Sequence, residues 1–229
     1  MLLTSRPATD RLMKFVIVPV KDLSHAKNRL SSLLPQDVRT DIAYAMLEDV
    51  LTALAAARLP DKKLIVTMDK RAAEIARGLG MEVLEETEQK GESASVDEAS
   101  LRCKEMGASS VLVIPGDAPL ITAYDIDAVL ERELPPPSAV LVPARDFMGT
   151  NAILRNPPDA FPSRFGDDSF RKHKNEAAGR GVRVESFENP RIALDIDHPE
   201  DLREFLSVES DTVTGRLLSR MGLVDKVTG

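Results

Sequence analysis

Short apolar runs that alternate with helical segments constrain the fold of this chain more than any other feature of its sequence. A run of about four to eight apolar residues between polar ones is typical of a strand buried on both faces of a parallel sheet. Such runs predict strands at residues 15–20, 63–68, 81–84, 111–114 and 139–142.

The segments between these runs have helical periodicity. The longest, 36–59, carries Ile42, Met46 and Val50 at helical spacing and is followed by Pro60, which cannot continue a helix. Strands that alternate with helices predict an α/β fold with an open, mostly parallel sheet and helices on both faces. Shorter helices are predicted at residues 72–78, 96–106 and 124–133.

The chain carries no Gly/Ser-rich linker, block of like charges or internal repeat that would divide it. We therefore expect a single domain at residues 13–206. A flexible N-terminal extension at 1–12 precedes this domain, and a C-terminal tail at 207–229, predicted to be helical, follows it.

Composition excludes several functional classes. With 30 Lys and Arg against 37 Asp and Glu, the formal net charge is -7, which argues against a nucleic-acid partner. No run of about 18 apolar residues could span a membrane, and the opening residues lack the apolar core of a signal peptide, so we expect a cytoplasmic protein with no membrane partner. The single cysteine, Cys103, is expected to be a buried, inert thiol.

Ligands of such sheets gather at the carboxyl ends of the strands. Asp117 follows the run 111–114 in a turn that contains Gly116 and Pro119, so its carboxylate is expected to project beyond the sheet edge. A turn aspartate that merely caps the next helix is the alternative.

A second acidic pair follows the late apolar stretch 192–194, which we expect to end at the same edge. Asp195 and Asp197 alternate along an extended segment and therefore share one face. Together with Asp117 they could supply the hard oxygen ligands that Mg²⁺ prefers. Alternatively, Asp197 only caps a helix that begins near Pro199.

The loop that leaves the first strand carries the basic residues Lys21, Lys27 and Arg29. Three cations that face three carboxylates in an acidic protein are suited to bind a magnesium triphosphate. The loop contains no glycine and is no Walker A sequence, so side chains would neutralise most of the phosphate charge. A solvated helix face is the alternative.

A third cluster spans residues 149–152 and 164–171. Ser169 is predicted to cap a helix, whose free N–H groups would attract an anion, and Thr150 and Gly166 offer further donors. The alternative is a plain capped helix after a glycine turn. His173, in the same cluster, is expected to be exposed to solvent.

Five motifs in this order closely resemble the CofC/FbiD guanylyltransferases: PVK with AKNRL (19–30), IPGDAPL (114–120), GTNAIL (149–154), RFGDDSFRKH (164–173) and LDIDHPEDL (194–202). The resemblance covers roughly residues 14–206. It implies a Rossmann-like, GT-A-type nucleotidyltransferase fold and a homodimer. It also implies the transfer of GMP from GTP to 2-phospho-L-lactate, phosphoenolpyruvate or 3-phospho-D-glycerate in coenzyme F-420 biosynthesis.

The family pattern also implies roles for individual residues. Asp117, Asp195 and Asp197 would hold Mg²⁺, and Thr150, Gly166 and Ser169 would hold the phosphorylated carboxylic acid. Nucleotide binding would fall to Lys21, Lys27, Arg29, Ser93 and Ser95, with the three cations and Asp117 as the catalytic set. The segment 91–99 (GESASVDEA) departs from the GLN-type sequence of many relatives and resembles the base-binding loop of cytidylyltransferases.

This chemistry requires no general base, because a phosphate monoester is mostly a dianion at neutral pH and can attack the α-phosphorus directly. The competing enzymatic interpretations on the same fold are a cytidylyltransferase and a molybdopterin-type guanylyltransferase. A nucleotide-binding sensor without turnover would not need three carboxylates. A nicotinamide dehydrogenase is set aside, because no GxGxxG follows the first strand.

Overall fold

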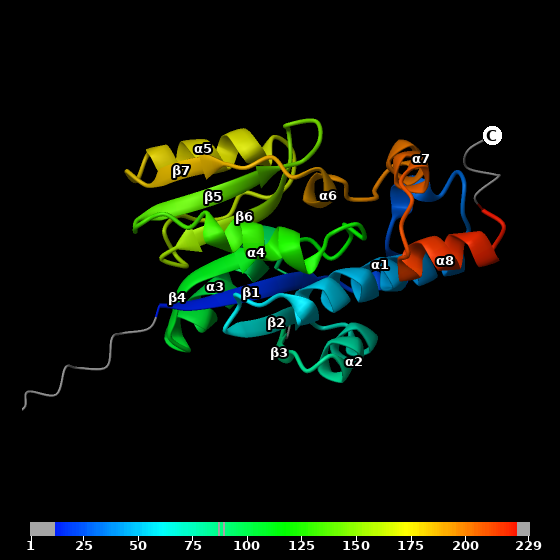
Figure 1. Ribbon diagram of the computed structural model, residues 1–229, viewed down its shortest axis with the longest axis horizontal. Coiled ribbons are helices and arrows are strands. Elements are labelled where there is room, and N and C mark those ends of the chain that lie inside the picture. The colour runs from blue at the N-terminus through cyan, green and yellow to red at the C-terminus, as the bar shows by residue number, and fades with distance from the viewer. Residues whose placement is uncertain (1–11, 87, 89, 224–229) are drawn as a thin grey trace, which may run out of the picture.

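A computed structural model describes residues 12–86, 88 and 90–223, so most of the predicted N-terminal extension and the end of the tail lie outside the described residues. The described chain forms one seven-stranded sheet in the order β3-β2-β1-β4-β6-β5-β7 (Figure 1). Only β6 runs antiparallel to its two neighbours, β4 and β5, and the other pairs are parallel. The strands are β1 (Met13–Val20), β2 (Lys62–Thr67), β3 (Glu82–Glu85), β4 (Ala108–Val113), β5 (Ser138–Pro143), β6 (Thr150–Asn156) and β7 (Arg183–Ser186).

The mostly parallel α/β sheet predicted from the sequence is therefore confirmed, and each of the five predicted strands is present with its ends shifted by no more than three residues. Strands β6 and β7 were not predicted. β6 ends in the polar residues Arg155 and Asn156, both of which are buried, and β7 is an edge strand without a buried residue. Neither strand presents the continuous apolar run on which the prediction relied.

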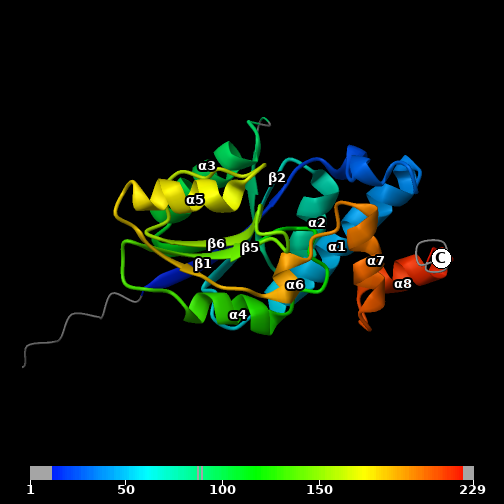
Figure 2. The same cartoon turned by 90° about the horizontal axis from the view of Figure 1, so that it is seen from above.

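Helices cover both faces of the sheet, as predicted (Figure 2). Alternate residues of β1 face opposite sides, so Val16 and Val18 pack against α1, α2 and α4, whereas Phe15 and Ile17 pack on the side of α3 and α5. Cys103 of α3 is fully buried there, as expected, and burial raises the pKa of its thiol to about 11. The helices are α1 (Gln36–Ala56), α2 (Lys70–Gly78), α3 (Glu92–Glu105), α4 (Ala123–Glu131), α5 (Ser169–Ala178), α6 (Pro190–Ala193), α7 (Pro199–Ser207) and α8 (Val213–Arg220).

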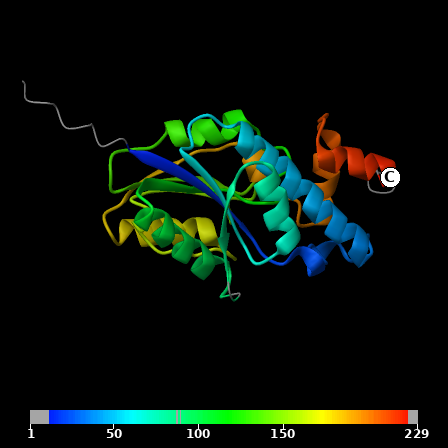
Figure 3. The same cartoon turned by 90° about the horizontal axis from the view of Figure 1, so that it is seen from below.

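A third apolar cluster lies at one end of the molecule, where α7 and α8 pack beside α1 (Figures 1 and 3). Leu218 of α8 and Phe205 of α7 share this cluster with Ile42 of α1. Leu30, from the basic loop, and Ile196, from the acidic segment, belong to the same cluster. Their burial therefore anchors both charged segments of the candidate site. The domain limit at residue 206 stays a prediction.

None of the helices in the described ranges has the length and apolar character needed to cross a bilayer.

Arg155 of β6 is a buried charge that ties the sheet to α3. Its side chain is 1 % exposed, and its guanidinium donates to Asp97 Oδ1 at 2.9 Å, to the Phe161 carbonyl at 2.6 Å and to Ser100 Oγ at 2.8 Å. Asp97 also accepts hydrogen bonds from Ser163 N and Ser163 Oγ. This one carboxylate therefore compensates the buried guanidinium and fixes the segment that leads to α5.

We expect Asp97→Ala to lower the free energy of unfolding by about 3 kcal/mol, because it leaves the Arg155 guanidinium buried without its counter-charge. That loss corresponds to a melting temperature roughly 6–12 °C lower for a chain of this length. Glu85→Ala is the control, since its ion pair with Arg77 is exposed and should contribute less than about 1 kcal/mol. Equal losses in the two variants would contradict a buried charge network at Arg155.

Candidate active site

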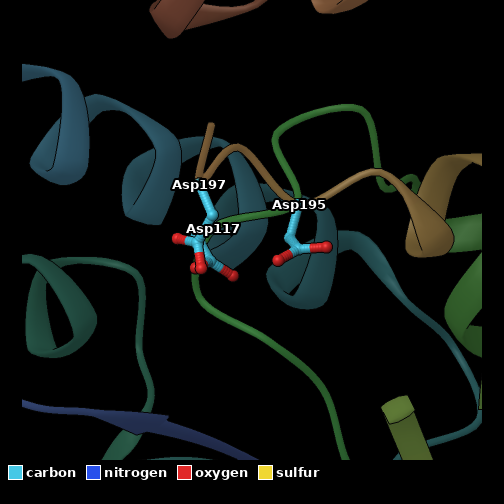
Figure 4. A group of neighbouring side chains, drawn as sticks. All are labelled: Asp117, Asp195 and Asp197. Atoms are coloured by element: carbon cyan, nitrogen blue, oxygen red, sulfur yellow. The ribbon is translucent and has the colours of Figure 1, made fainter. Parts of the chain in front are cut away.

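The three predicted metal-ligating aspartates meet at one point (Figure 4). One oxygen atom from each of Asp117, Asp195 and Asp197 lies within 4.8 Å of the other two. Asp117 lies on the loop after β4, and the other two lie on the segment after α6. The predicted convergence of these carboxylates is therefore present.

Backbone pairing and side-chain alternation position the acidic pair. The Ile196 N–H donates to the Asp117 carbonyl at 3.1 Å, which joins the two segments. Leu194 and Ile196 are buried, so Asp195 and Asp197 project from the opposite side of the chain, as the alternation predicted.

The apolar residues before this pair do not form a strand. Pro190 and Ile192 belong to the one-turn helix α6, because Asn189 Oδ1 accepts hydrogen bonds from the N–H groups of Arg191 and Ile192. The acidic segment therefore reaches the sheet edge from a capped helical turn.

The Lys27 ammonium lies between two of the three carboxylates. Its Nζ is 2.6 Å from Asp117 Oδ2 and 2.7 Å from Asp197 Oδ1, and its side chain is only 7 % exposed. Lys27 adopts a left-handed backbone conformation, with φ at 56°, which is uncommon for a residue other than glycine. The cluster thus holds a cation that the chain itself supplies.

The pKa values in the cluster follow from this arrangement. Burial alone would lower the pKa of Lys27, but attraction to Asp117 and Asp197 outweighs it, so the pKa is raised. Burial likewise opposes ionisation of Asp197, yet Lys27 holds the pKa of that carboxyl below its ordinary value. Burial and the neighbouring Asp117 raise the pKa of Asp195. The site therefore concentrates negative charge that only a cation can balance.

Three oxygen ligands at this separation fit a hard divalent cation. Asn151 supports the set from outside, since its Nδ2 donates to Asp195 Oδ1 at 2.9 Å and to the Ile192 carbonyl at 2.9 Å. The sequence analysis did not single out Asn151, although it belongs to the GTN motif.

Lys21 and Arg29 lie on either side of Lys27 and are far more exposed. Arg29 Nη1 is 3.3 Å from Asp197 Oδ2, whereas Lys21 Nζ pairs with Glu92 Oε2 at 3.4 Å. Glu92 was not among the predicted site residues either. It lines both of the cavities, described next, that contain Asp117 and Asp197 in their walls. Lys27 and Arg29 of the basic loop thus contact the acidic cluster, whereas Lys21 pairs with a carboxylate outside it.

Two cavities open on the acidic cluster and share Asp117 and Asp197 in their walls. One, of about 420 Å³, is lined by Lys21, Lys27 and Ser95. The other, of about 500 Å³, is lined by Arg29 together with all three residues predicted to hold the acceptor, Thr150, Gly166 and Ser169. The site thus has two separate volumes that share these carboxylates in their walls.

Ser169 is not the N-cap of α5, which corrects the prediction. Asp168 occupies the N-cap position with φ at 54°, and Ser169 is the first helical residue, only 2 % exposed. Its Oγ accepts the Thr150 N–H at 2.8 Å. The left-handed turn at Asp168 places the serine hydroxyl against β6 instead of above the helix end. Gly166 has φ at 104°, a conformation that favours glycine.

Ser93 Oγ accepts the Phe165 N–H at 2.9 Å, and Ser95 lines the cavity that contains Lys27 whereas Ser93 does not. The roles of both serines in nucleotide binding stay predictions. His173, expected to be exposed, is fully buried. Its position one helical turn after Ser169, on the same face of α5, is the signal that would have indicated this.

The fold is similar to that of solved nucleotidyltransferase structures. A Desulfovibrio desulfuricans structure described as a candidate nucleotide-diphospho-sugar transferase superposes with a TM-score of 0.75 at 17 % identity, over 93 % of this chain and 97 % of that one. A cytidylyltransferase from Leptospira borgpetersenii superposes with a TM-score of 0.58 at 13 % identity, over 95 % and 97 %. These similarities define the fold.

Sequence similarity defines the family. The model of the guanylyl transferase CofC-like family matches residues 13–228, beyond the motifs quoted above, and the chain belongs to this family. A phosphoenolpyruvate guanylyltransferase from Rubrobacter xylanophilus is 42 % identical over 82 % of this chain and 91 % of its own length. A 2-phospho-L-lactate guanylyltransferase from Methanothermobacter thermautotrophicus is 35 % identical over 83 % and 82 %, and a 3-phospho-D-glycerate guanylyltransferase from Colwellia psychrerythraea is 33 % identical over 88 % and 95 %.

The geometry predicts a competition between Lys27 and Mg²⁺. In Lys27→Met, the divalent cation no longer has to displace an ammonium from Asp117 and Asp197, so Mg²⁺ should stabilise this variant more than the wild type. A tenfold tighter site corresponds to roughly 3–5 °C of additional melting temperature at saturating Mg²⁺. Lys21→Met, at the exposed lysine outside the cluster, should respond as the wild type does. Thermal unfolding with and without Mg²⁺ measures both, and equal responses in all three proteins would refute the competition.

Burial, aided by the positive charge of Arg155, lowers the pKa of His173 from 6.5 to about 4. As the pH falls below 6.5, the unfolded chain binds a proton before the folded chain does, so stability is lost between pH 6.5 and 4. The loss from this one group is about 3 kcal/mol. His173→Asn has no titratable group, and its free energy of unfolding should fall less steeply over that range. Denaturant unfolding at several pH values tests this, and parallel curves would contradict it.

Proposed function

We propose that this protein is a cytoplasmic guanylyltransferase that moves GMP from GTP to the phosphate of a small phosphorylated carboxylic acid and releases pyrophosphate, in coenzyme F-420 biosynthesis. The observation that carries the proposal is the pair of cavities that meet at the acidic cluster. A group transfer between two phosphorylated substrates needs two binding volumes with the reacting atoms at their junction. Membership of the CofC-like family and the activities named for its relatives support the choice of nucleotide and acceptor.

Asp117, Asp195 and Asp197 would hold Mg²⁺, which when bound would neutralise the charge of the phosphoryl oxygens. The residues around them then have distinct tasks. Asn151 keeps the Asp195 carboxylate oriented through its 2.9 Å hydrogen bond. Lys27 lines one of the two cavities and contacts Asp117 and Asp197, which both cavities share, so its ammonium would be within reach of a phosphate there.

The nucleotide occupies the cavity lined by Lys21, Lys27 and Ser95. Lys21 is exposed at the rim of this cavity, and Arg29 lies in the wall of the other cavity beside the shared Asp197. In our proposal both cations neutralise the pyrophosphate as it leaves. Ser93 has no part in this cavity in our proposal, because Ser95 lines the cavity and Ser93 does not.

The acceptor occupies the second cavity, with its phosphate at Thr150, Gly166 and Ser169 and its attacking oxygen turned toward Asp117. The phosphate is already a dianion at neutral pH, so orientation and charge neutralisation carry the reaction and no side chain has to remove a proton. Phosphoenolpyruvate, 2-phospho-L-lactate and 3-phospho-D-glycerate share a phosphate and a carboxylate. The cavity can therefore distinguish them only by their other groups. All three acids therefore belong in the first assay. The homodimer implied by the resemblance stays a prediction.

Purified protein should release pyrophosphate when supplied with Mg²⁺, GTP and at least one of the three acids. Each nucleoside triphosphate is paired with each acid, and pyrophosphate is measured by a coupled enzyme assay. Turnover with CTP in place of GTP would instead assign the chain to the cytidylyltransferase alternative. No turnover with any pair would contradict the proposed reaction.

Asp117→Asn should reduce turnover by about two orders of magnitude or more while the protein remains folded, because it removes a charged ligand from the cluster that both cavities share. Asp167→Asn removes one negative charge from the wall of the acceptor cavity without touching the cluster, so its rate should stay within a few fold of the wild type. Steady-state kinetics with a melting curve for each variant separate a lost ligand from a lost fold. Equal rates in the two variants would show that Asp117 has no special role.

A further inference from the structure

His173 connects the two segments that form the acceptor cavity. Its imidazole is fully buried in α5, with Nδ1 3.0 Å from Thr150 Oγ1 at the start of β6 and Nε2 2.7 Å from the Arg164 nitrogen in the loop before α5. The rings of Phe165 and Phe161 lie 5.1 and 6.3 Å from the imidazole, between centroids. The histidine is therefore packed beside two aromatic rings and hydrogen-bonded at both nitrogen atoms.

These contacts fix the tautomer. A backbone N–H can only donate, so Nε2, which faces the Arg164 nitrogen, must be the acceptor. The proton of the neutral ring then lies on Nδ1 and is donated to Thr150 Oγ1. The Thr150 hydroxyl is thus an acceptor toward the histidine.

The same contact determines where the Thr150 hydroxyl proton can be donated. Thr150 Oγ1 has no other partner among the described residues, so its proton is available to an acceptor in the cavity that Thr150 lines. Ser169 is in the same state, because its Oγ accepts the Thr150 N–H and thereby leaves its own proton free. Both hydroxyls are therefore prepared to donate, as an anionic phosphate requires.

His173 also helps to hold the loop that precedes α5 in place. Three successive N–H groups of this loop donate to three different side chains: Ser163 to Asp97, Arg164 to His173 and Phe165 to Ser93. The backbone is thereby held up to Phe165, which itself lines the acceptor cavity beside Gly166.

We propose that His173 is a positioning residue of the acceptor site, whose Nδ1–H turns the Thr150 hydroxyl into a hydrogen-bond donor toward the acceptor phosphate. The inference rests on the proposed function, because it assumes that the cavity at Thr150 binds a phosphorylated acid. His173 itself touches neither the cavity nor the acidic cluster. Its two nitrogen atoms have separable tasks: Nδ1 sets the polarity of the hydroxyl, and Nε2 holds the loop.

Two amide substitutions separate these tasks. In His173→Asn, the side-chain NH₂ can take the place of Nδ1–H and still donate to Thr150 Oγ1, but nothing replaces Nε2. In His173→Gln, the side-chain oxygen can take the place of Nε2 and still accept from Arg164, but the donor to Thr150 is lost. Both variants are similar in polarity and neither can titrate, so stability alone does not distinguish them.

The test is a calorimetric titration of each variant with phosphoenolpyruvate in the presence of Mg²⁺ and without nucleotide, followed by kinetics with GTP. We expect His173→Gln to bind phosphoenolpyruvate about tenfold to a hundredfold more weakly, the range for a lost hydrogen bond to a charged group. His173→Asn should stay within about threefold of the wild type, and KM for GTP should be unchanged in both. Equal affinities in the two variants, or a greater loss in His173→Asn, would overturn the proposal.

Thr150→Val keeps the test decisive if His173→Gln does not fold. It removes the hydroxyl at nearly constant volume and should lose as much affinity as His173→Gln, and the double variant should lose no more than either single variant. Wild-type affinity in Thr150→Val would overturn the role of His173. If instead the wild type binds none of the three acids, the proposed function fails. These two results are distinguishable, because the first compares variants and the second concerns the unaltered protein.

Discussion

The ion cluster of Lys27 with Asp117 and Asp197 is the interaction on which the rest of the site depends. Three carboxylates with oxygen atoms within 4.8 Å of one another would repel strongly if nothing balanced their charge. The buried Lys27 ammonium, 2.6 Å from Asp117 and 2.7 Å from Asp197, offsets part of this repulsion and holds the acidic segment in place. The same arrangement explains how the chain can hold a site for a divalent cation without losing its fold when that cation is absent.

The strength of this cluster comes from burial, and the burial comes from the third apolar cluster. Leu30 follows Lys27 in the chain and Ile196 separates the two aspartates, and both side chains are fully buried among α1, α7 and α8. Opposite charges are therefore brought together by apolar residues that are their neighbours in sequence. The C-terminal tail, which the sequence predicted to lie outside the domain, contributes α8 to this packing. It thereby supports the two charged segments of the site through the third apolar cluster.

Much of this could be predicted, and what could not has physical reasons. The alternation of apolar runs gave β1 to β5, and the alternation of Leu194, Asp195, Ile196 and Asp197 gave the shared face of the acidic pair. Contacts between distant segments were inaccessible, because no local pattern reports that Ser169 Oγ meets the Thr150 N–H or that Ser93 meets Phe165. Serine is a residue type preferred at the N-cap. In α5, however, Asp168 takes that position in a left-handed conformation, and Ser169 is the first helical residue.

The single antiparallel strand of the sheet brings Thr150 to the same edge as Asp117 and the basic loop. β1 and β4 are parallel, so their carboxyl ends lead the basic loop and Asp117 to one edge of the sheet. β6 runs antiparallel to β4, and its first residue, Thr150, therefore lies at that same edge. A parallel strand in that place would put Thr150 at the opposite edge, roughly 20 Å away for a strand of this length. In our proposal, the antiparallel strand thus adds the acceptor site to an edge where the parallel strands already place the nucleotide site, and His173 acts on the acceptor site alone.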